Sequence, residues 1–286
     1  MSVKSILKKL FFPVVLIVRI NRTYKMGVRF KNWNNIVMGG ELIVSLNKPK
    51  GKFYIDARSH IMRAMFSGRY EENTMQLLNK LEINEGVIIN IGANIGLFAI
   101  HLAKVFPSKK IIAIEPNPEA YSLLVKNIPV NNCSGSITAI NVCVSDVSGK
   151  LSFSIIPGKS EYSSISGIVH KSVEQEIQKI IEVESKQLKE IVLDKKVSLI
   201  FMDVEGAEKK IIDGSIDILL KDKPIIVCEC NNELLKKFDS TSLELVSILE
   251  KLNYNVTNAD KPSKKVKHPY NGNILAIAKS NNIFKK

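Results

Sequence analysis

A glycine-bearing turn follows an apolar run about one third of the way along the chain. The run from Val87 to Ile91 leads into Gly92-Ala93-Asn94-Ile95-Gly96, and a helical pattern then begins. At the end of a parallel strand, such a turn lets the backbone approach a ligand closely. The turn matches neither the dinucleotide fingerprint G-x-G-x-x-G nor the phosphate loop G-x-x-x-x-G-K-[ST], which argues against a pyrophosphate ligand.

Single acidic residues end the next two apolar runs. Glu115 follows Ile-Ile-Ala-Ile, 23 positions after Gly92, where a carboxylate can accept hydrogen bonds from ribose hydroxyls. Asp146 follows the run that ends at Val144 and could reach a base amino group. A turn through Ser145 to Gly149 explains Asp146 nearly as well.

Three carboxylates follow a later apolar run, in Asp203-Val-Glu205-Gly-Ala-Glu208. A helix cap and an acid in the first helical turn would explain two of them. Glu229 and Asn231 end the next run, and because parallel strands end at one edge of a sheet they are expected beside Asp203. The group forms either a polar rim, which we favour, or a divalent-metal site.

The apolar runs alternate with helical patterns, which is typical of βα units. The runs VSLIFM and PIIVC are continuously apolar, as buried parallel strands are. The sequence therefore predicts one doubly wound α/β domain. Strands are expected at 87–91, 110–114, 137–144, 197–202, 225–230, 254–257 and 274–278, with 151–156 and 180–184 as further strands. Helices are expected at 95–105, 118–128, 207–220 and 234–252.

The first part of the chain differs from this pattern. Short apolar runs from Val28 to Ile55, broken by glycine pairs and turn residues, predict a hairpin or a few antiparallel strands. Helical spacing from Gly68 to Leu81 leads into the main domain. We therefore expect an N-terminal segment at 1–67 and the main domain at 68–286.

Charge is concentrated at the two ends of the chain. The net charge is +13, from 41 Lys and Arg against 28 Asp and Glu, but residues 1–40 hold eight basic and no acidic residues and residues 261–286 hold seven and none. The 220 residues between them are nearly neutral. Because a nucleic-acid enzyme usually follows phosphates with a basic stripe on its catalytic face, this distribution makes nucleic acid an unlikely partner. The lysines from Lys261 to Lys267 fit a solvated loop.

The apolar run from Leu10 to Val18 holds nine residues, with Pro13 inside and basic residues on both sides. A membrane-spanning helix needs about 20 residues, and no small-x-small cleavage site follows. We expect a cytoplasmic protein whose N-terminus either packs on the body or contacts an anionic membrane surface. The four cysteines show no zinc-ligand spacing and are expected to be small buried residues in a reduced compartment.

Four segments together resemble the FkbM-type methyltransferases, over roughly residues 68–278. They are Ile-Asn90-Ile-Gly-Ala-Asn-Ile-Gly, Ile-Glu115-Pro-Asn117-Pro, Val-Ser-Asp146 with Gly149, and Phe-Met-Asp203-Val-Glu-Gly-Ala-Glu-x-x-Ile-Ile-x-Gly214. The resemblance implies a class I, Rossmann-like fold with a mostly parallel seven-stranded sheet, one strand of it antiparallel. It also implies S-adenosylmethionine as cofactor and methyl transfer, usually to a hydroxyl oxygen.

The resemblance assigns roles to named residues. The cofactor would be bound by Asn90, Gly92, Ala93, Asn94, Gly96, Glu115, Asn117 and Asp146. The candidates for catalysis are Asp203, which strand-end geometry favours as the base, with Glu205 and Glu229; His170 and His268 are alternatives, and no resident metal is expected. The family usually has Asp at position 90, and the loss of that charge is expected to weaken cofactor binding by about 1–2 kcal/mol. The acid of the family's Leu-Asp pair is also missing, since Lys189 follows Leu188.

The expected reaction is O-methylation of a sugar, glycan or secondary metabolite. A lipid-linked glycan at the inner membrane face would suit the basic, apolar N-terminus. Two rival classes remain. A nucleic-acid methyltransferase would use the basic ends to hold phosphates, and a non-catalytic scaffold of the same fold would account for Asn90. An NAD-dependent oxidoreductase is the weakest alternative because the turn lacks the required glycines.

Overall fold

The computed structural model describes residues 29–30, 41–47, 49–56, 58–59, 71–165 and 177–281. The predicted apolar element from Leu10 to Val18, the predicted boundary at 67/68 and His170 lie outside these residues. Within the described ranges, no helix is both long and apolar enough to cross a bilayer.

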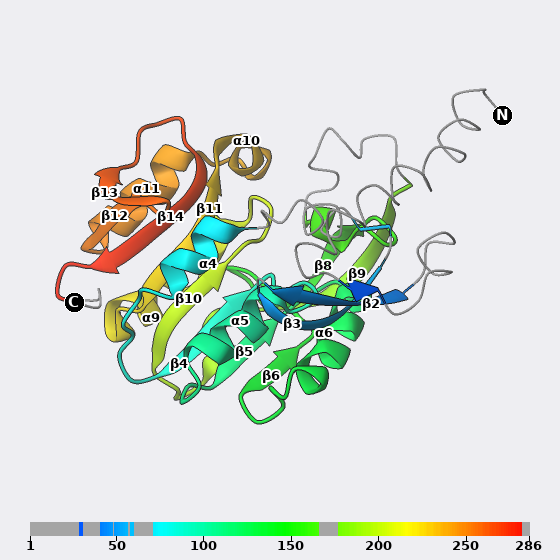
Figure 1. Ribbon diagram of the computed structural model, residues 1–286. Coiled ribbons are helices and arrows are strands. Elements are labelled where there is room, and N and C mark those ends of the chain that lie inside the picture. The colour runs from blue at the N-terminus through cyan, green and yellow to red at the C-terminus, as the bar shows by residue number, and fades with distance from the viewer. Residues whose placement is uncertain are drawn as a thin grey trace, which may run out of the picture.

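An eight-stranded sheet forms the centre of the molecule (Figure 1), in the order β13-β12-β14-β11-β10-β4-β5-β6. Neighbouring strands from β11 to β6 run parallel, whereas β14 is antiparallel to both of its neighbours. The predicted doubly wound, mostly parallel sheet is confirmed. The strands are β4 (Val87–Ile91), β5 (Ile111–Ile114), β6 (Ile137–Ile140), β10 (Val197–Met202), β11 (Ile225–Asn231), β12 (Tyr254–Asn258), β13 (Lys261–Lys265) and β14 (Asn271–Ala278).

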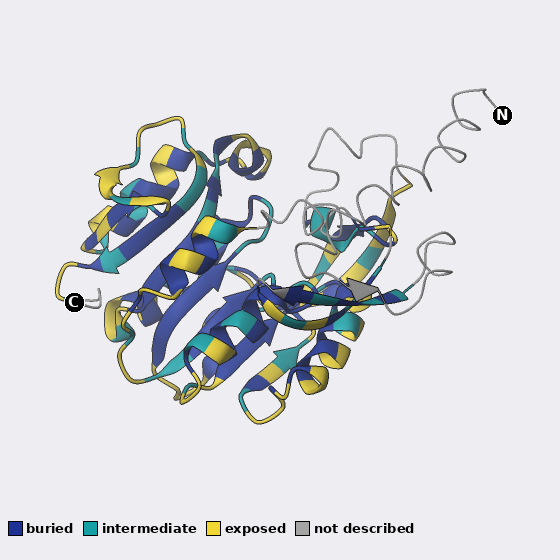
Figure 2. Cartoon of the chain, in the orientation of Figure 1, coloured by how far each residue is buried: buried dark blue, intermediate teal, exposed yellow. Residues whose placement is uncertain are grey.

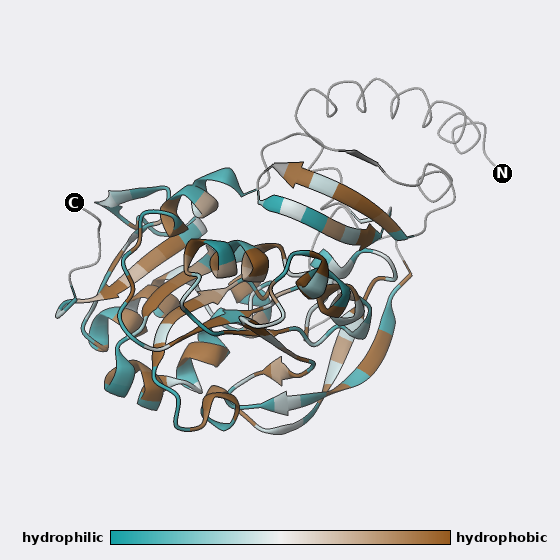
Figure 3. Ribbon diagram, turned by 60° about the horizontal axis from the view of Figure 1, so that its bottom comes forward, coloured by the Kyte–Doolittle hydropathy of each residue, from teal (hydrophilic) through white to brown (hydrophobic). Residues whose placement is uncertain are grey.

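Helices cover both faces of the sheet, which explains its continuously apolar strands. All residues of β5 and β10 are buried, and successive side chains enter two different cores because strand residues alternate between faces. Figure 2 shows the strands buried and the outer helix faces exposed, and Figure 3 shows the same strands as mainly hydrophobic. All four cysteines are free and buried, as predicted.

Each core belongs to one layer of helices. One core joins the sheet to α4 (Glu72–Leu78), α5 (Leu97–Val105) and α6 (Pro118–Val130). The other joins it to α7 (Leu188–Val192), α8 (Glu208–Asp213), α9 (Ile216–Asp222) and α11 (Ser242–Lys251). The predicted helices at 95–105 and 118–128 are confirmed, and α4 lies within the predicted helical segment 68–81.

The N-terminal antiparallel strands are also confirmed. The strands β1 (Arg29–Phe30), β2 (Glu41–Asn47) and β3 (Lys50–Asp56) form a separate three-stranded sheet. Buried Asn127 of α6 holds this sheet: its Oδ1 accepts from the Tyr54 N–H (2.6 Å), and its Nδ2 donates to the carbonyls of Tyr54 (3.0 Å) and Ile95 (2.8 Å). One amide therefore joins the N-terminal sheet, α6 and the turn before α5.

The predicted single strand at 137–144 is wrong, because the chain changes sheet within it. β6 ends at Ile140, and the Asn141 side chain then donates to the carbonyls of Glu115 and Pro116. The next strand, β7 (Cys143–Val144), pairs with β9 (Lys179–Lys186) in a small sheet of order β7-β9-β8. Its third strand is β8 (Gly149–Ile155), so the further strands predicted at 151–156 and 180–184 are confirmed.

Both long helices predicted in the second half are broken. The helix expected at 207–220 is split into α8 and α9, and at the break Gly214 packs on Asp146, whose Cα would lie 2.7 Å from an added Cβ. The helix expected at 234–252 is split into α10 (Asn232–Leu235), η3 (Lys236–Phe238) and α11. There Asp239 adopts a left-handed conformation (φ 53°), and the Thr241 side chain caps α11.

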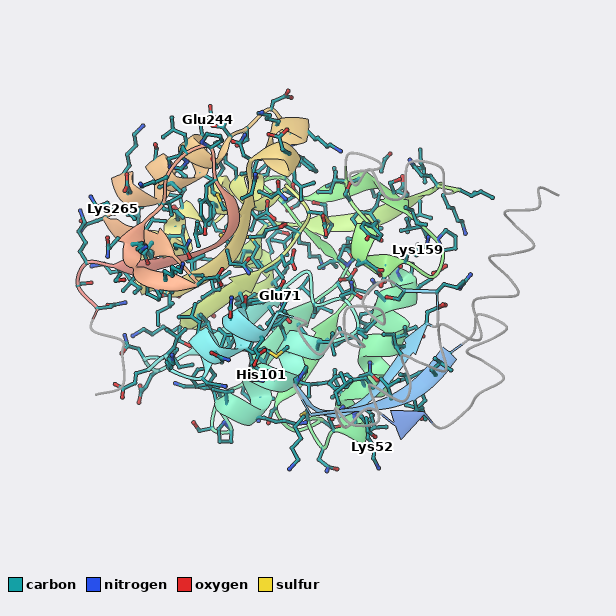
Figure 4. The ribbon with its side chains drawn as sticks, turned by 45° about the horizontal axis from the view of Figure 1, so that its top comes forward. Lys52, Glu71, His101, Lys159, Glu244 and Lys265 are labelled. Carbon is teal, nitrogen blue, oxygen red and sulfur yellow. The ribbon has the colours of Figure 1, made fainter. Side chains whose placement is uncertain are left out.

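The lysine-rich segment at 261–267 is not a loop throughout. Lys261–Lys265 forms the edge strand β13, antiparallel to β12, so the sheet has one strand more than the seven expected. Its lysines are nevertheless exposed, as a solvated segment requires. Figure 4 shows Lys265 and Lys52 at opposite ends of the molecule.

We predict that Asn127→Ala lowers the free energy of unfolding by about 3 kcal/mol, because it leaves backbone groups of Tyr54 and Ile95 without partners. Urea denaturation measures the loss, and hydrogen exchange should show faster opening of β3. Val125→Ala, an exposed position on the same helix, is the control. Equal stability of the two variants would show that Asn127 does not anchor the N-terminal sheet.

Candidate active site

A cavity of about 880 Å³, including its part open to solvent, lies at the carboxyl ends of β4, β5 and β10. Six of the predicted site residues line it: Gly92, Ala93, Asn94, Glu115, Asp203 and Glu205. The cavity is at the topological switch point, where ligands of open α/β sheets bind.

The floor of the cavity is a close contact between two strand-end turns. Gly92 has a φ of 74°, and a Cβ there would lie 1.9 Å from the backbone oxygen of Asp203. The N–H groups of Gly92 and Ala93 both donate to the Ile114 carbonyl, at 3.0 and 2.9 Å. Only glycine fits at position 92, which is the close backbone approach that the sequence predicted.

Glu115 is buried at the tip of β5, with an exposed fraction of 5%. Its Oε2 accepts from the Asn94 N–H at 2.7 Å, and its Oε1 accepts from the Asn117 N–H at 2.8 Å. Burial raises the pKa of Glu115 to about 7, and these two hydrogen bonds oppose the rise. Each carboxylate oxygen can accept a further hydrogen bond, so the side chain is both fixed in place and able to bind a donor.

The carboxylates after β10 and β11 differ in their surroundings. Burial, followed by repulsion from Glu71, raises the pKa of Asp203 to about 6; Glu71 lies at the centre of the view in Figure 4. Burial also raises the pKa of Glu205 well above its usual range and that of Glu229 to about 10, and nearby carboxylates add to both shifts. With a pKa near 6, Asp203 is better suited than Glu229, whose pKa is about 10, to accept a proton at neutral pH.

Glu208 has a structural role. Its Oε1 accepts from the N–H groups of Val204 (3.2 Å) and Gly206 (3.3 Å), which closes the turn that carries Asp203 and Glu205. It also lies in the first turn of α8. This agrees with the expectation that ordinary helix-start chemistry explains part of the acidic cluster.

Five predicted site residues do not line the cavity. Gly96 is the left-handed N-cap of α5, and Asn117 caps α6 through its side chain. Asp146 accepts from the Ser145 hydroxyl at 2.8 Å, which fits the turn role left open by the sequence. Glu229 lies outside the lining. Asn90 is fully buried in β4, and neither polar atom of its amide has a hydrogen-bond partner among the described residues.

One wall of the cavity is formed by residues that the sequence analysis did not name as site residues. It comes from η1 (Ser160–Tyr162) and the residues after it, including Ser160, Glu161 and Ser163. The Ser160 hydroxyl donates to Asn94 Oδ1 (2.7 Å), and Asn117 Nδ2 donates to Ser163 Oγ (2.9 Å). The sequence shows only a polar loop here, and what brings it to the cavity is the pairing of β8 with β9, which no motif marks.

The sequence analysis raised two alternatives to Asp203 as the base: a divalent-metal site at this position, and a histidine as the base. Neither finds support in the described part of the chain. No group of three or more His, Cys, Asp or Glu side chains there could hold a metal ion. His268 contacts the buried Ser242 hydroxyl through Nδ1 (3.0 Å), at the start of α11, and does not line the cavity. His268 therefore supports local structure and is not a base for this site.

Residues 90–256, more than half of the chain, match the family model of the methyltransferase FkbM domain. The chain belongs to the FkbM methyltransferase family. Its domain has the Rossmann-like, mostly parallel α/β sheet described above, and the family's cofactor is S-adenosylmethionine. The order of motifs around the glycine turn, Glu115 and the Asp203 turn indicated this family in the sequence.

Relatives among characterised proteins are distant. Methyltransferase sdnD of Sordaria araneosa is 26% identical over 153 residues, 44% of this chain and 59% of that protein. Methyltransferase 1 of Beauveria bassiana is 30% identical over 47% of this chain and 60% of its own length. The 2-O-methyltransferase NoeI of Sinorhizobium fredii is 28% identical over 56% of this chain and 69% of its own length. The chain thus spans only about 60% of the first two.

Similar solved structures share low identity with the chain. The methyltransferase FkbM of Methylobacillus flagellatus is 15% identical, with a TM-score of 0.44, over 68% of this chain and 43% of the other. The TYW2 protein of M. jannaschii, solved with AdoMet, is 16% identical, with a TM-score of 0.41, over 84% of each chain.

The cavity fits S-adenosylmethionine. Glu115 offers carboxylate oxygens to ribose hydroxyls, and the backbone from Gly92 to Asn94 leaves room for close approach. Apolar side chains, including Val142, Val144 and Phe153, line another part of the cavity and suit a base. The Asn90 amide, buried in β4 just before this turn, has no hydrogen-bond partner among the described residues. The expected weakening at Asn90 stays a prediction.

We predict that the stability of the ligand-free protein falls as pH rises from about 4.5 to 7. A carboxyl with a raised pKa binds more protons in the folded than in the unfolded state across this window, so the slope is negative; Glu115 alone contributes about 3 kcal/mol. Urea denaturation at several pH values measures it, and Glu115→Gln should flatten the fall. Exposed Glu250, changed to Gln, should leave the slope intact, and stability that rises over this range would contradict the assignment.

Proposed function

We propose that the protein transfers a methyl group from S-adenosylmethionine to a hydroxyl of a sugar, glycan or secondary metabolite. The observation that carries the proposal is the half-buried carboxylate of Asp203, which lines the cavity and has a pKa near 6. A hydroxyl is the acceptor that benefits from such a base. The name of NoeI, a 2-O-methyltransferase, supports the same class of reaction.

The protein's own contribution is mainly positioning. The cofactor supplies a methyl group on a sulfonium that is already activated, so holding the acceptor oxygen close and in line accounts for much of the acceleration. Asp203 accepts the hydroxyl proton as the oxygen gains its methyl group. Glu229, whose pKa is about 10, lies outside the cavity lining and takes no part in this step.

The lining of the cavity argues against the nucleic-acid alternative. Glu115, Glu161, Asp203 and Glu205 line it, and its described lining includes no Lys, Arg or His. A phosphate backbone approaching this opening would meet carboxylates, whereas nucleic-acid enzymes hold phosphates with basic side chains. The exposed lysines of β13 lie on the edge strand of the sheet, five positions from β4 in the strand order.

Two measurements test the proposal. Calorimetric titration should show binding of S-adenosylmethionine and not of NAD, weakened by Glu115→Ala. Release of S-adenosylhomocysteine should then depend on hydroxyl acceptors from a panel of sugars, glycans and phenols, with a methyl ether in the product by mass spectrometry. Cofactor binding without turnover on any hydroxyl would favour the scaffold alternative, and turnover on RNA alone would favour the nucleic-acid alternative.

We predict that Asp203→Asn lowers kcat about 100-fold, because it removes the general base, while the Kd for S-adenosylmethionine changes little. In the unmodified protein kcat should rise with pH through an apparent pKa near 6, and this rise should disappear in the variant. Glu229→Gln, outside the cavity lining, is the control. An equal loss in both variants would show that Asp203 is not the base.

A further inference from the structure

Two carboxylates from distant parts of the chain lie on the walls of the same cavity. Glu161 belongs to η1, and Glu205 belongs to the turn after β10. Repulsion from Glu161 is one of the influences that raise the pKa of Glu205, so the two side chains are near enough to affect each other. Two neighbouring carboxyl groups on the walls of one cavity disfavour an anionic ligand group and favour one that donates hydrogen bonds or carries positive charge.

The carboxylate of Glu161 and the backbone of Glu205 are held in place. The Ser59 hydroxyl donates to Glu161 Oε2 at 3.0 Å, and Ser59 is buried with an exposed fraction of 4%. Glu205 adopts a left-handed conformation (φ 57°), and the next residue, Gly206, packs so closely that an added Cβ would lie 2.7 Å from the Leu234 carbonyl oxygen. Ser59 follows β3, so the N-terminal part of the chain helps to position a wall of the cavity.

We propose that Glu161 and Glu205 form the acceptor subsite, and that it binds a non-anionic, hydrogen-bond-donating group beside the hydroxyl to be methylated. A vicinal diol and an ammonium group are the two sources of that chemistry. The inference rests on the proposed function, since it names the acceptor class for the same cavity. Glu161 is then a specificity-determining residue, and Ser59 is a positioning residue that acts through it.

A second cavity gives room for the rest of the acceptor and has the same charge preference. It encloses about 910 Å³ with its open part, adjoins the first cavity at Ser160, and is lined by Glu41, Asp56 and Glu119 among others. Among its described lining residues Arg58 is the only basic one, and it is paired with Asp56 at 2.6 Å. Glu41 is paired with Lys126, also at 2.6 Å, and Glu119 adds negative charge, so the described lining offers an anionic acceptor no unpaired basic side chain.

The test compares three sugars that differ in charge. Protein saturated with S-adenosylhomocysteine is titrated with methyl α-D-glucopyranoside, D-glucosamine and D-glucuronate, and saturation-transfer NMR measures each Kd. We expect D-glucuronate to bind about tenfold more weakly than the neutral or cationic sugar. Glu161→Gln should bring the three sugars within about threefold of one another, and Ser59→Ala should shift them in the same direction by less. Glu250→Gln should match the unmodified protein.

The outcomes separate this inference from the proposed function. Unchanged affinity for S-adenosylhomocysteine in Glu161→Gln, together with lost charge selection, supports the subsite. A selective loss of D-glucosamine binding identifies the ammonium group, and an equal loss of both favoured sugars identifies the diol. Equal binding of D-glucuronate, no sugar binding to the loaded protein, or unaltered selection in Glu161→Gln overturns the inference. Failure of the unmodified protein to bind S-adenosylhomocysteine would instead refute the proposed function.

Discussion

The contact between Gly92 and the backbone of Asp203 is the constraint on which the rest of the site depends. It presses the end of β4 against the end of β10, with no space for a side chain between them. The Asp203 N–H donates to the Ile91 carbonyl at 3.1 Å, so the two turns are also hydrogen-bonded. The candidate base and the turn that faces the cofactor therefore cannot move independently, and their relative position exists before any ligand arrives.

Folding the site costs free energy because it brings several carboxyl groups together away from solvent. Glu115 and Glu208 offset part of that cost by accepting two backbone N–H groups each, and in doing so they close the loops that carry the other functional groups. Asp203 and Glu205 have no such compensation among the described residues. This contrast divides the acids into those that build the site and those left available to a ligand.

Much of the site could be predicted because each strand of the parallel sheet ends at the same edge. Glu115 and Asp203 were found from their place after apolar runs, and that logic needs no tertiary information. It failed for Asp146 and Glu229, which occupy strand-end positions yet lie outside the cavity lining, because the strand end alone does not fix where a side chain points. The same strand-end logic could not identify Glu161 or Ser59. Glu161 comes to the cavity through the pairing of β8 with β9, and Ser59, which donates a hydrogen bond to Glu161, comes with the N-terminal sheet.

The fold itself followed the hydrophobic pattern closely where strands were buried on both faces. Errors fell where a local contact overrode a continuous pattern: Gly214 on Asp146 split one helix, left-handed Asp239 split another, and Asn141 ended β6. In each case the hydrophobic periodicity continued across the break and did not mark it. The strand β13 was missed because its residues are mostly exposed lysines. An exposed edge strand of this kind has no alternating apolar pattern from which it could be predicted.

That edge strand has a consequence for how copies of the protein can meet. A free sheet edge presents unpaired N–H and C=O groups to any passing strand. Here β13 carries three lysines and Pro262, which has no N–H to donate, and β6 at the far end has only four residues. Charge repulsion protects one edge and the short length of β6 limits pairing at the other, so the sheet resists extension by a strand of a neighbouring molecule.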